Sequence, residues 1–152
     1  DPYVSSEDAA ELDCLMHDDL NGLFKACTHI SVHCNLSQDT HHLVNSDRLA
    51  MMPGVGTDGT VCGNYLVNCA RGGIVDEAAV LDALNSGILS GASLDVFEDE
   101  PAIGNALLQH ERFHGSPHIG AATLEAQTRV GAEMVRLLSA FFDGDRPDSA
   151  IN

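Results

Sequence analysis

The spacing of apolar and polar positions changes several times along the chain, and each spacing predicts a different element. Residues 28–33 (THISVH) alternate apolar and polar side chains and include β-branched types, which predicts a strand. Short apolar runs at 65–68 and 92–96 predict two further strands. Between the first two strands, residues 53–63 (PGVGTDGTVCG) form a glycine-rich stretch that predicts a flexible loop.

Two helices are expected from apolar residues that recur at helical spacing. The first is capped by Asp76 and ends before Gly87. Its apolar positions are Ala79, Val80, Ala83 and Leu84. The second is a long amphipathic helix from about residue 123 to residue 142, ending at Gly144. Its apolar face comprises Ala126, Val130, Met134, Leu137, Leu138 and Phe141.

The alternation of strands and helices predicts an α/β layer with a parallel sheet. In such sheets, ligands bind beyond the carboxyl ends of the strands. The segments after Val32, Asn68 and Val96 are therefore the expected location of a site.

Composition narrows the class of protein further. The chain has 152 residues, 44% of them apolar, which suits one folded domain. Lys and Arg number 7 against 23 Asp and Glu, so the net charge is −16 and nucleic acid and anionic membranes are poor partners. We find neither an apolar run of about 20 residues nor a signal-peptide pattern, so we expect a cytoplasmic protein.

The acidity comes mainly from a shortage of bases, since Lys25 is the only lysine. Adaptation to a high-salt cytoplasm, where screening removes self-repulsion, is one interpretation. An ordinary acidic surface is the other.

Cysteines and histidines do not predict a metal site. The cysteines are odd in number and contain no C-x-x-C, which indicates reduced thiols: Cys14, Cys27, Cys34, Cys62 and Cys69. His110, His114 and His118 recur at four-residue spacing, which would align three ligands on a helix. Gly115 and Pro117 disfavour a helix there, so we expect no metal.

Charged side chains follow the predicted strands. Arg71 comes after the second strand, Asp95 and Glu100 lie at and after the third, and His118 follows later. A guanidinium can bind a carboxylate and polarise a neighbouring carbonyl, and an imidazole can exchange a proton near neutral pH. A carboxylate beside that imidazole would orient it. If the groups converge, they suit carbonyl reduction.

Three segments carry a specific resemblance to a known family. They read VNCARGGIVDE at 67–77, GASLDVFEDEP at 91–101 and SPHIGAAT at 116–123. In order and spacing they resemble the D-isomer-specific 2-hydroxyacid dehydrogenases, which include phosphoglycerate dehydrogenase, glyoxylate/hydroxypyruvate reductase and the C-terminal-binding-protein corepressors. The resemblance implies a Rossmann-like, doubly wound parallel sheet and an NAD-dependent oxidoreductase that moves a hydride between nicotinamide and C2 of a D-2-hydroxy or 2-oxo acid. It also implies a homodimer.

The same resemblance implies roles for individual residues. Arg71 would bind the carboxylate and carbonyl of the substrate, His118 would act as acid/base, and Glu100 would pair with His118. Asp95 would hydrogen-bond the nicotinamide carboxamide, and Asp1 the ribose hydroxyls, which favours NAD over NADP. The full implied cofactor-binding set is Asp1, Cys34, Cys69, Ala70, Arg71, Asp95, His118, Gly120 and Ala121.

The sequence also departs from the pattern of the family, which changes what we expect of this chain alone. The glycine-rich G-x-G-x-x-G motif would precede Asp1, and Gly54-Val55-Gly56 does not replace it because it neither follows a strand nor opens a capped helix. Residues 1–152 are therefore expected to be the second half of an NAD-binding domain, with the first βαβ unit and the substrate domain absent. We expect weak NAD binding and little turnover from this chain alone.

Alternatives to the enzyme stay open. One is an NAD(H)-sensing interaction module, as in the corepressor branch, and another is a structural fragment without its own activity. Residues 55–64 resemble an insertion before the second strand. We expect it to bulge outwards, because loops tolerate added length; displacement of Arg71 is the other possibility.

Overall fold

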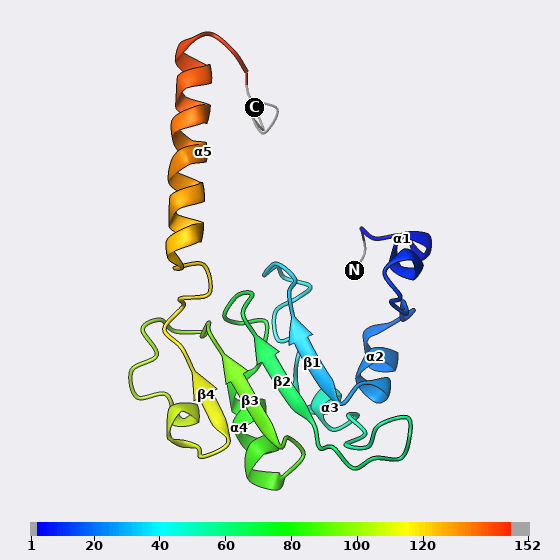
Figure 1. The fold of residues 1–152 in the computed structure, drawn as a ribbon. Coiled ribbons are helices and arrows are strands. Elements are labelled where there is room, and N and C mark those ends of the chain that lie inside the picture. The colour runs from blue at the N-terminus through cyan, green and yellow to red at the C-terminus, as the bar shows by residue number, and fades with distance from the viewer. Residues whose placement is uncertain (1–2, 147–152) are drawn as a thin grey trace. The chain divides into compact units, whose positions relative to one another are not determined.

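The computed structural model describes residues 3–146, which divide into a first unit up to Pro117 and a second unit from His118 (Figure 1). The first unit contains, in order, α1 (Ser6–Glu11), α2 (Leu20–Ala26), β1 (His29–Val32), α3 (Ser46–Leu49), β2 (Tyr65–Asn68), α4 (Glu77–Ser86), β3 (Gly91–Leu94), the 3-10 helix η1 (Ala106–Gln109) and β4 (Phe113–Gly115). The second unit contains α5 (Leu124–Phe142). Among the described residues, no helix has the length and apolar character needed to cross a membrane.

The strands form one parallel sheet in the order β1-β2-β3-β4. The predicted parallel α/β sheet is thus confirmed. All the carboxyl ends of the strands point to one edge of the sheet, at the top of Figure 1. This edge is where the loops bearing the candidate residues begin.

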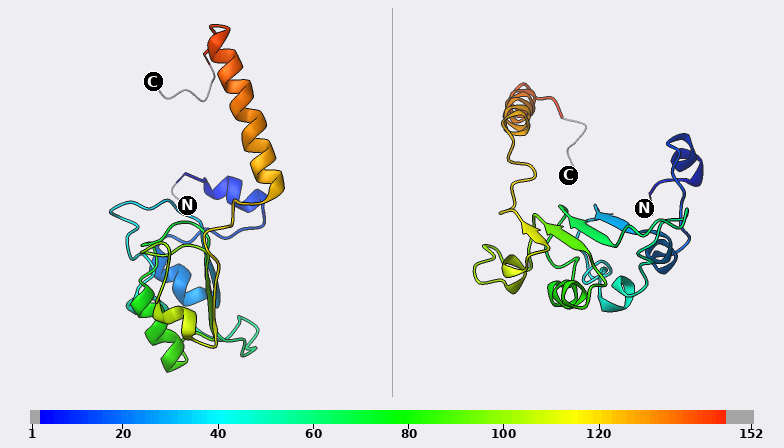
Figure 2. Two further views of the ribbon diagram at one scale, coloured as in Figure 1. Left: turned by 90° about the vertical axis from the view of Figure 1, so that its left-hand side faces the viewer. Right: turned by 60° about the horizontal axis from the view of Figure 1, so that its bottom comes forward.

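Side chains alternate between the two faces of the sheet. Ile30, Leu66 and Leu94 point into the core, where α2, α3, α4 and η1 cover the sheet (Figure 2). Burial of each such aliphatic side chain contributes about 1.5–3 kcal/mol. Tyr65 and Val67 lie on the other face and are exposed.

Both predicted helices form, and the first has the expected caps. The Asp76 side chain accepts a hydrogen bond from the Ala79 backbone N–H at 3.1 Å, and Gly87 ends α4 in the left-handed conformation at φ 79°. α5 is capped by Thr123, whose hydroxyl accepts from the Ala126 N–H. Its apolar face is largely exposed within the described residues, with Phe141 68% accessible.

The glycine-rich stretch is a hydrogen-bonded turn at the amino end of β2. Its backbone closes through Gly56 N–H to Thr60 O and through a bridge between Val55 and Val61. The Thr60 N–H and hydroxyl both donate to the Asp58 carboxylate, which holds the pKa of Asp58 below its ordinary value. Figure 2 shows the turn projecting away from the sheet, as expected for an outward bulge.

The strand that follows this turn, β2, is in register with its neighbours. Val67 pairs with Ser31 on one side and Ser93 on the other. At the start of the strand, the buried side chain of Asn64 donates to the Met52 and Ile88 carbonyls and accepts from the Gly54 N–H. The segment at residues 55–64 is therefore anchored before β2 begins, so it leaves the strand that leads to Arg71 in place.

Candidate functional site

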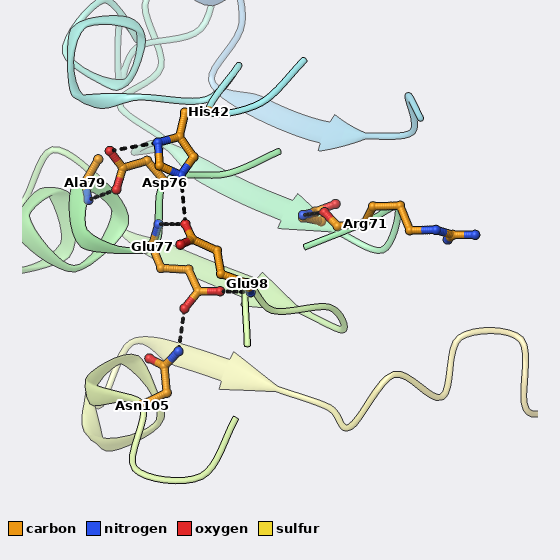
Figure 3. Close-up of polar contacts among 8 residues, drawn as sticks. His42, Arg71, Asp76, Glu77, Ala79, Glu98 and Asn105 are labelled. Atoms are coloured by element: carbon orange, nitrogen blue, oxygen red, sulfur yellow. Dashed lines mark hydrogen bonds and ion pairs between the residues drawn. The ribbon is translucent and has the colours of Figure 1, made fainter. Parts of the chain in front are cut away.

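The loop after β2 is shaped by the side chain of Asn68. Its carbonyl oxygen accepts from the Ala70 N–H at 2.9 Å, and its amide donates to the Arg71 carbonyl oxygen at 3.0 Å. Arg71 then extends beyond the carboxyl end of the strand, with its guanidinium exposed (Figure 3). One guanidinium nitrogen donates to the Ala70 carbonyl oxygen at 2.6 Å. The chain thus presents a cation at the edge where the sequence predicts a site.

The loop after β3 carries two of the predicted carboxylates. Asp95 is 4% exposed and accepts a hydrogen bond from the Ser116 hydroxyl at 2.5 Å, which joins the ends of β3 and β4. Glu100 accepts from the Phe97 N–H at 3.0 Å, so its own loop orients its carboxylate. Arg71, Asp95 and Glu100 therefore all follow the carboxyl ends of neighbouring strands.

The loops after β2 and β3 are in direct contact. A Cβ atom at Gly72 would stand 1.7 Å from the Phe97 carbonyl oxygen, so only glycine permits this approach. The Asp95 N–H also donates to the Asn68 carbonyl at 2.9 Å. Contact between the backbones fixes the two loops relative to each other.

A polar network at the start of α4 links three loops (Figure 3). The Glu98 N–H donates to the Glu77 carboxylate at 2.6 Å, and the Glu77 N–H donates to Glu98 at 3.5 Å. The Glu98 carboxylate also lies 3.0 Å from Nε2 of His42, and Asn105 donates to Glu77 at 2.5 Å. His42 belongs to the loop after β1, so the network ties that loop to the segment that carries Glu100.

The predicted cofactor residue after β1 is Cys34, which is half-buried and packs on the core. The Thr40 hydroxyl organises the loop that follows. It accepts from the Ser37 N–H and donates to the Asn35 carbonyl oxygen, both at 2.7 Å. Cys69, after β2, is exposed and Ala70 is half-buried. Asp1 lies outside the described residues.

The remaining predicted site residues, His118, Gly120 and Ala121, belong to the second unit. His118 has the left-handed backbone conformation, with φ 54°. The meeting of His118 with Glu100 and Arg71 stays a prediction. Residues 113–115 form β4, so His110, His114 and His118 do not share a helix. Within residues 3–146, no group of three or more His, Cys, Asp or Glu side chains is arranged to hold a metal ion.

Several residues whose side chains hold the loops of this edge carry no clear signal in the sequence. The sequence shows Asn68 only as the end of a strand and as part of the segment at 67–77, although its place three residues before Arg71 was a usable signal. Glu98 and His42 are 56 positions apart, and no local pattern connects them. Ser116, which holds Asp95, was visible only as part of a motif.

The fold and this edge define a Rossmann-type nucleotide-binding domain. Residues 1–120 match the family described as D-isomer specific 2-hydroxyacid dehydrogenase, NAD binding domain. The chain belongs to this family. The predictions of family, fold class and NAD as cofactor are thereby confirmed at the level of the family.

Individual relatives agree with this assignment. The chain is 35% identical over 152 residues to D-3-phosphoglycerate dehydrogenase of Methanocaldococcus jannaschii, covering 100% of this chain and 28% of the relative. It is 42% identical over 134 residues to the human D-3-phosphoglycerate dehydrogenase, covering 88% of this chain and 24% of the relative. The chain thus spans about a quarter of the length of these curated relatives.

Solved structures show the same fold. A D-lactate dehydrogenase from Aquifex aeolicus, complexed with NAD and lactic acid, matches with a TM-score of 0.77 and 32% identity, over 94% of this chain and 45% of that one. A D-lactate dehydrogenase from Treponema pallidum matches with a TM-score of 0.79 and 29% identity, over 100% of this chain and 47% of that one.

Proposed function

We propose that this chain supplies the nicotinamide-binding and acid/base part of an NAD-dependent oxidoreductase of D-2-hydroxy acids. The supporting observation is the placement of Arg71, Asp95 and Glu100 at the carboxyl edge of one parallel sheet. Family membership supplies the reaction class, since the matched family is that of the 2-hydroxyacid dehydrogenases.

The residues at this edge suit a nicotinamide ring. Ala70 follows β2 and is half-buried, and its small methyl side chain leaves room for a flat ring beside it. The buried Asp95 carboxylate is an acceptor suited to a carboxamide N–H, and Ser116 keeps it oriented. Cys34 and Cys69, with Gly120 and Ala121, are the further proposed contacts. When bound, the dinucleotide would supply the hydride as NADH or accept it as NAD⁺.

Three side chains carry the rest of the proposed chemistry. Arg71 binds the carboxylate of the 2-oxo acid and draws electron density from the neighbouring carbonyl. His118 gives a proton to the C2 oxygen during reduction and removes it during oxidation. Glu100 orients the His118 ring and stabilises its protonated form.

The decisive experiment uses a chimaera in which this chain replaces the matching 152 residues of the Methanocaldococcus jannaschii enzyme. Hydride transfer to glyoxylate, hydroxypyruvate and phosphohydroxypyruvate is followed through the nicotinamide absorbance. His118→Ala is expected to lower the rate about 10²–10⁴-fold, the usual contribution of a general acid. His114→Ala, which changes an exposed histidine on β4, is the matched control and is expected to leave the rate unchanged.

The outcomes separate the candidate functions. Equal rates for the His118→Ala and His114→Ala chimaeras would contradict the proposed acid/base role. A chimaera that binds NADH without turnover would favour an NAD(H)-sensing interaction module. Isothermal titration of the 152-residue chain with NADH tests the expected weak binding, which saturation at micromolar concentrations would contradict.

Two proposals about the setting of the protein accompany this function. We infer a reducing cytoplasmic location, because all five cysteines are free thiols in the structure. We also infer a homodimer joined through the nucleotide-binding domain, by analogy with the family. Light scattering on the purified chain measures its mass directly, and a monomer at high protein concentration would contradict the dimer.

A further inference from the structure

Asn68 is a polar residue in an apolar place. It is the last residue of β2, its exposed fraction is 1%, and its side chain lies on the same face as Leu66. Its partner across the sheet is Leu94, which is also buried. Neighbouring positions on this face thus hold leucine, so packing alone does not explain an amide here.

Both ends of the Asn68 amide are used by the loop that follows. The carbonyl oxygen accepts from the Ala70 N–H and the amide nitrogen donates to the Arg71 carbonyl oxygen, at 2.9 and 3.0 Å. Backbone groups in a loop that leaves a sheet have no strand partner, and burial makes an unpaired group costly. The Asn68 side chain satisfies one donor and one acceptor within three residues.

These two bonds define where the Arg71 side chain leaves the backbone. One fixes the peptide before Ala70 and the other fixes the carbonyl of Arg71 itself, so residues 69–71 are held at both ends. The contact between Gly72 and Phe97 then holds the next residue. The direction in which the Arg71 side chain leaves the backbone is therefore fixed, and the hydrogen bond from the guanidinium to the Ala70 carbonyl oxygen orients its far end.

We propose that Asn68 is a positioning residue for Arg71, which sets the geometry of carboxylate binding. The inference rests on the proposed function, in which Arg71 binds the carboxylate of the substrate. Asn68 does not touch the substrate. It acts by holding the backbone that carries the guanidinium.

The sequence provides a matched control at the other end of the same strand. Asn64 is also buried, and its amide makes three hydrogen bonds to backbone groups away from the carboxyl edge. Asn68→Asp and Asn64→Asp are equal in size and charge change. Each keeps an acceptor and loses the donor, so each weakens the fold, but only the first disturbs the segment that carries Arg71.

The kinetic test compares these two variants in the chimaera. For Asn68→Asp, the KM for the 2-oxo acid is expected to rise about tenfold to a hundredfold, the loss expected when one hydrogen bond to a charged group is misaligned. The KM for NADH should change by less than about threefold in both variants. Equal changes of the 2-oxo acid KM for Asn64→Asp and Asn68→Asp would reduce Asn68 to a structural residue and overturn the proposal.

A second test uses the 152-residue chain and does not depend on turnover. Asn68→Leu removes the acceptor of the Ala70 N–H, whose hydrogen exchange should accelerate about tenfold or more, while Asn64→Leu should leave it unchanged. Unaltered exchange at Ala70 in Asn68→Leu would refute the positioning role even in an active chimaera. Conversely, faster exchange in the Asn68→Leu chain together with a wild-type chimaera that shows no turnover would refute the proposed function but support the role of Asn68 in holding the backbone of residues 69–71.

Discussion

Gly72 stands where the loop after β2 passes closest to the loop after β3. A Cβ atom at this position would lie 1.7 Å from the Phe97 carbonyl oxygen, 2.3 Å from its carbonyl carbon and 3.0 Å from the Glu98 nitrogen. All three are backbone atoms, which cannot rotate away as the end of a long side chain can. Gly72→Ala is therefore expected to push the two loops apart.

The size of the effect follows from these distances. Ordinary contact of a Cβ atom begins near 3.4 Å, so relief of the 1.7 Å approach needs a shift of about the same length. Forced overpacking of this kind costs about 1–3 kcal/mol. That is a large part of a typical free energy of unfolding of about 5–15 kcal/mol. For a chain of this size the Tm should fall by about 2–12 °C.

Thermal unfolding and hydrogen exchange together measure this prediction. The shift would break the hydrogen bonds from the Phe97 and Glu98 N–H groups to Glu100 and Glu77, so both amides should exchange faster. Gly131→Ala is the control: its Cβ would meet nothing within 4 Å on α5, and helix propensity predicts a neutral or stabilising change of up to about 1 kcal/mol. A Gly72→Ala protein with wild-type Tm and unchanged exchange would show that the close approach is wrong.

Three further predictions concern charge. Glu98→Ala should lower the free energy of unfolding by less than about 1 kcal/mol, because the contacts of Glu98 are partly exposed. Urea titration should show no such loss for the neighbouring Asp99→Ala, and equal losses in the two variants would contradict a stabilising role of the polar network around Glu98. Thr60→Val removes one donor to Asp58, so its pKa should rise towards the ordinary value in an NMR titration. A carboxyl group whose pKa is lowered in the folded state stabilises the fold above its unfolded pKa, and this contribution is lost as the pH falls through the folded pKa. An unchanged pKa of Asp58 in the variant would contradict the role of the Thr60 hydroxyl. Finally, molar KCl should raise the Tm of a chain of net charge −16, and greater stability in dilute buffer would refute salt adaptation.

The elements that could be predicted are those with strong local signals. β1 alternates apolar and polar residues, β2 is a short apolar run, and α4 has both its Asp76 cap and its Gly87 end, so the sequence located them within a residue or two. β4 was missed because it has only three residues and one buried side chain, too few for a period to show. The short helices α1, α2 and α3 were missed for the same reason.

In the site, too, residues with a local signal could be predicted and contacts between distant segments could not. Arg71, Asp95 and Glu100 were found because parallel strands bring their carboxyl ends to one edge, which any sequence with located strands reveals. The contacts between loops, such as His42 with Glu98, depend on tertiary structure across 56 positions and leave no local pattern. Our expectation of a flexible stretch at 53–63 took no account of the hydrogen bonds that close this turn.

The turn at residues 53–63 hangs from the amino rim of the sheet, whereas Arg71 leaves from the carboxyl rim of the same strand. The loop at the amino end of β2 can therefore change in length during evolution without moving the loop at the carboxyl end, because Asn64 anchors the start of the strand. The same separation provides a position for a label. A fluorophore or affinity tag inserted beside Gly59, where a Cβ would meet nothing within 4 Å, would lie at the opposite end of β2 from Arg71.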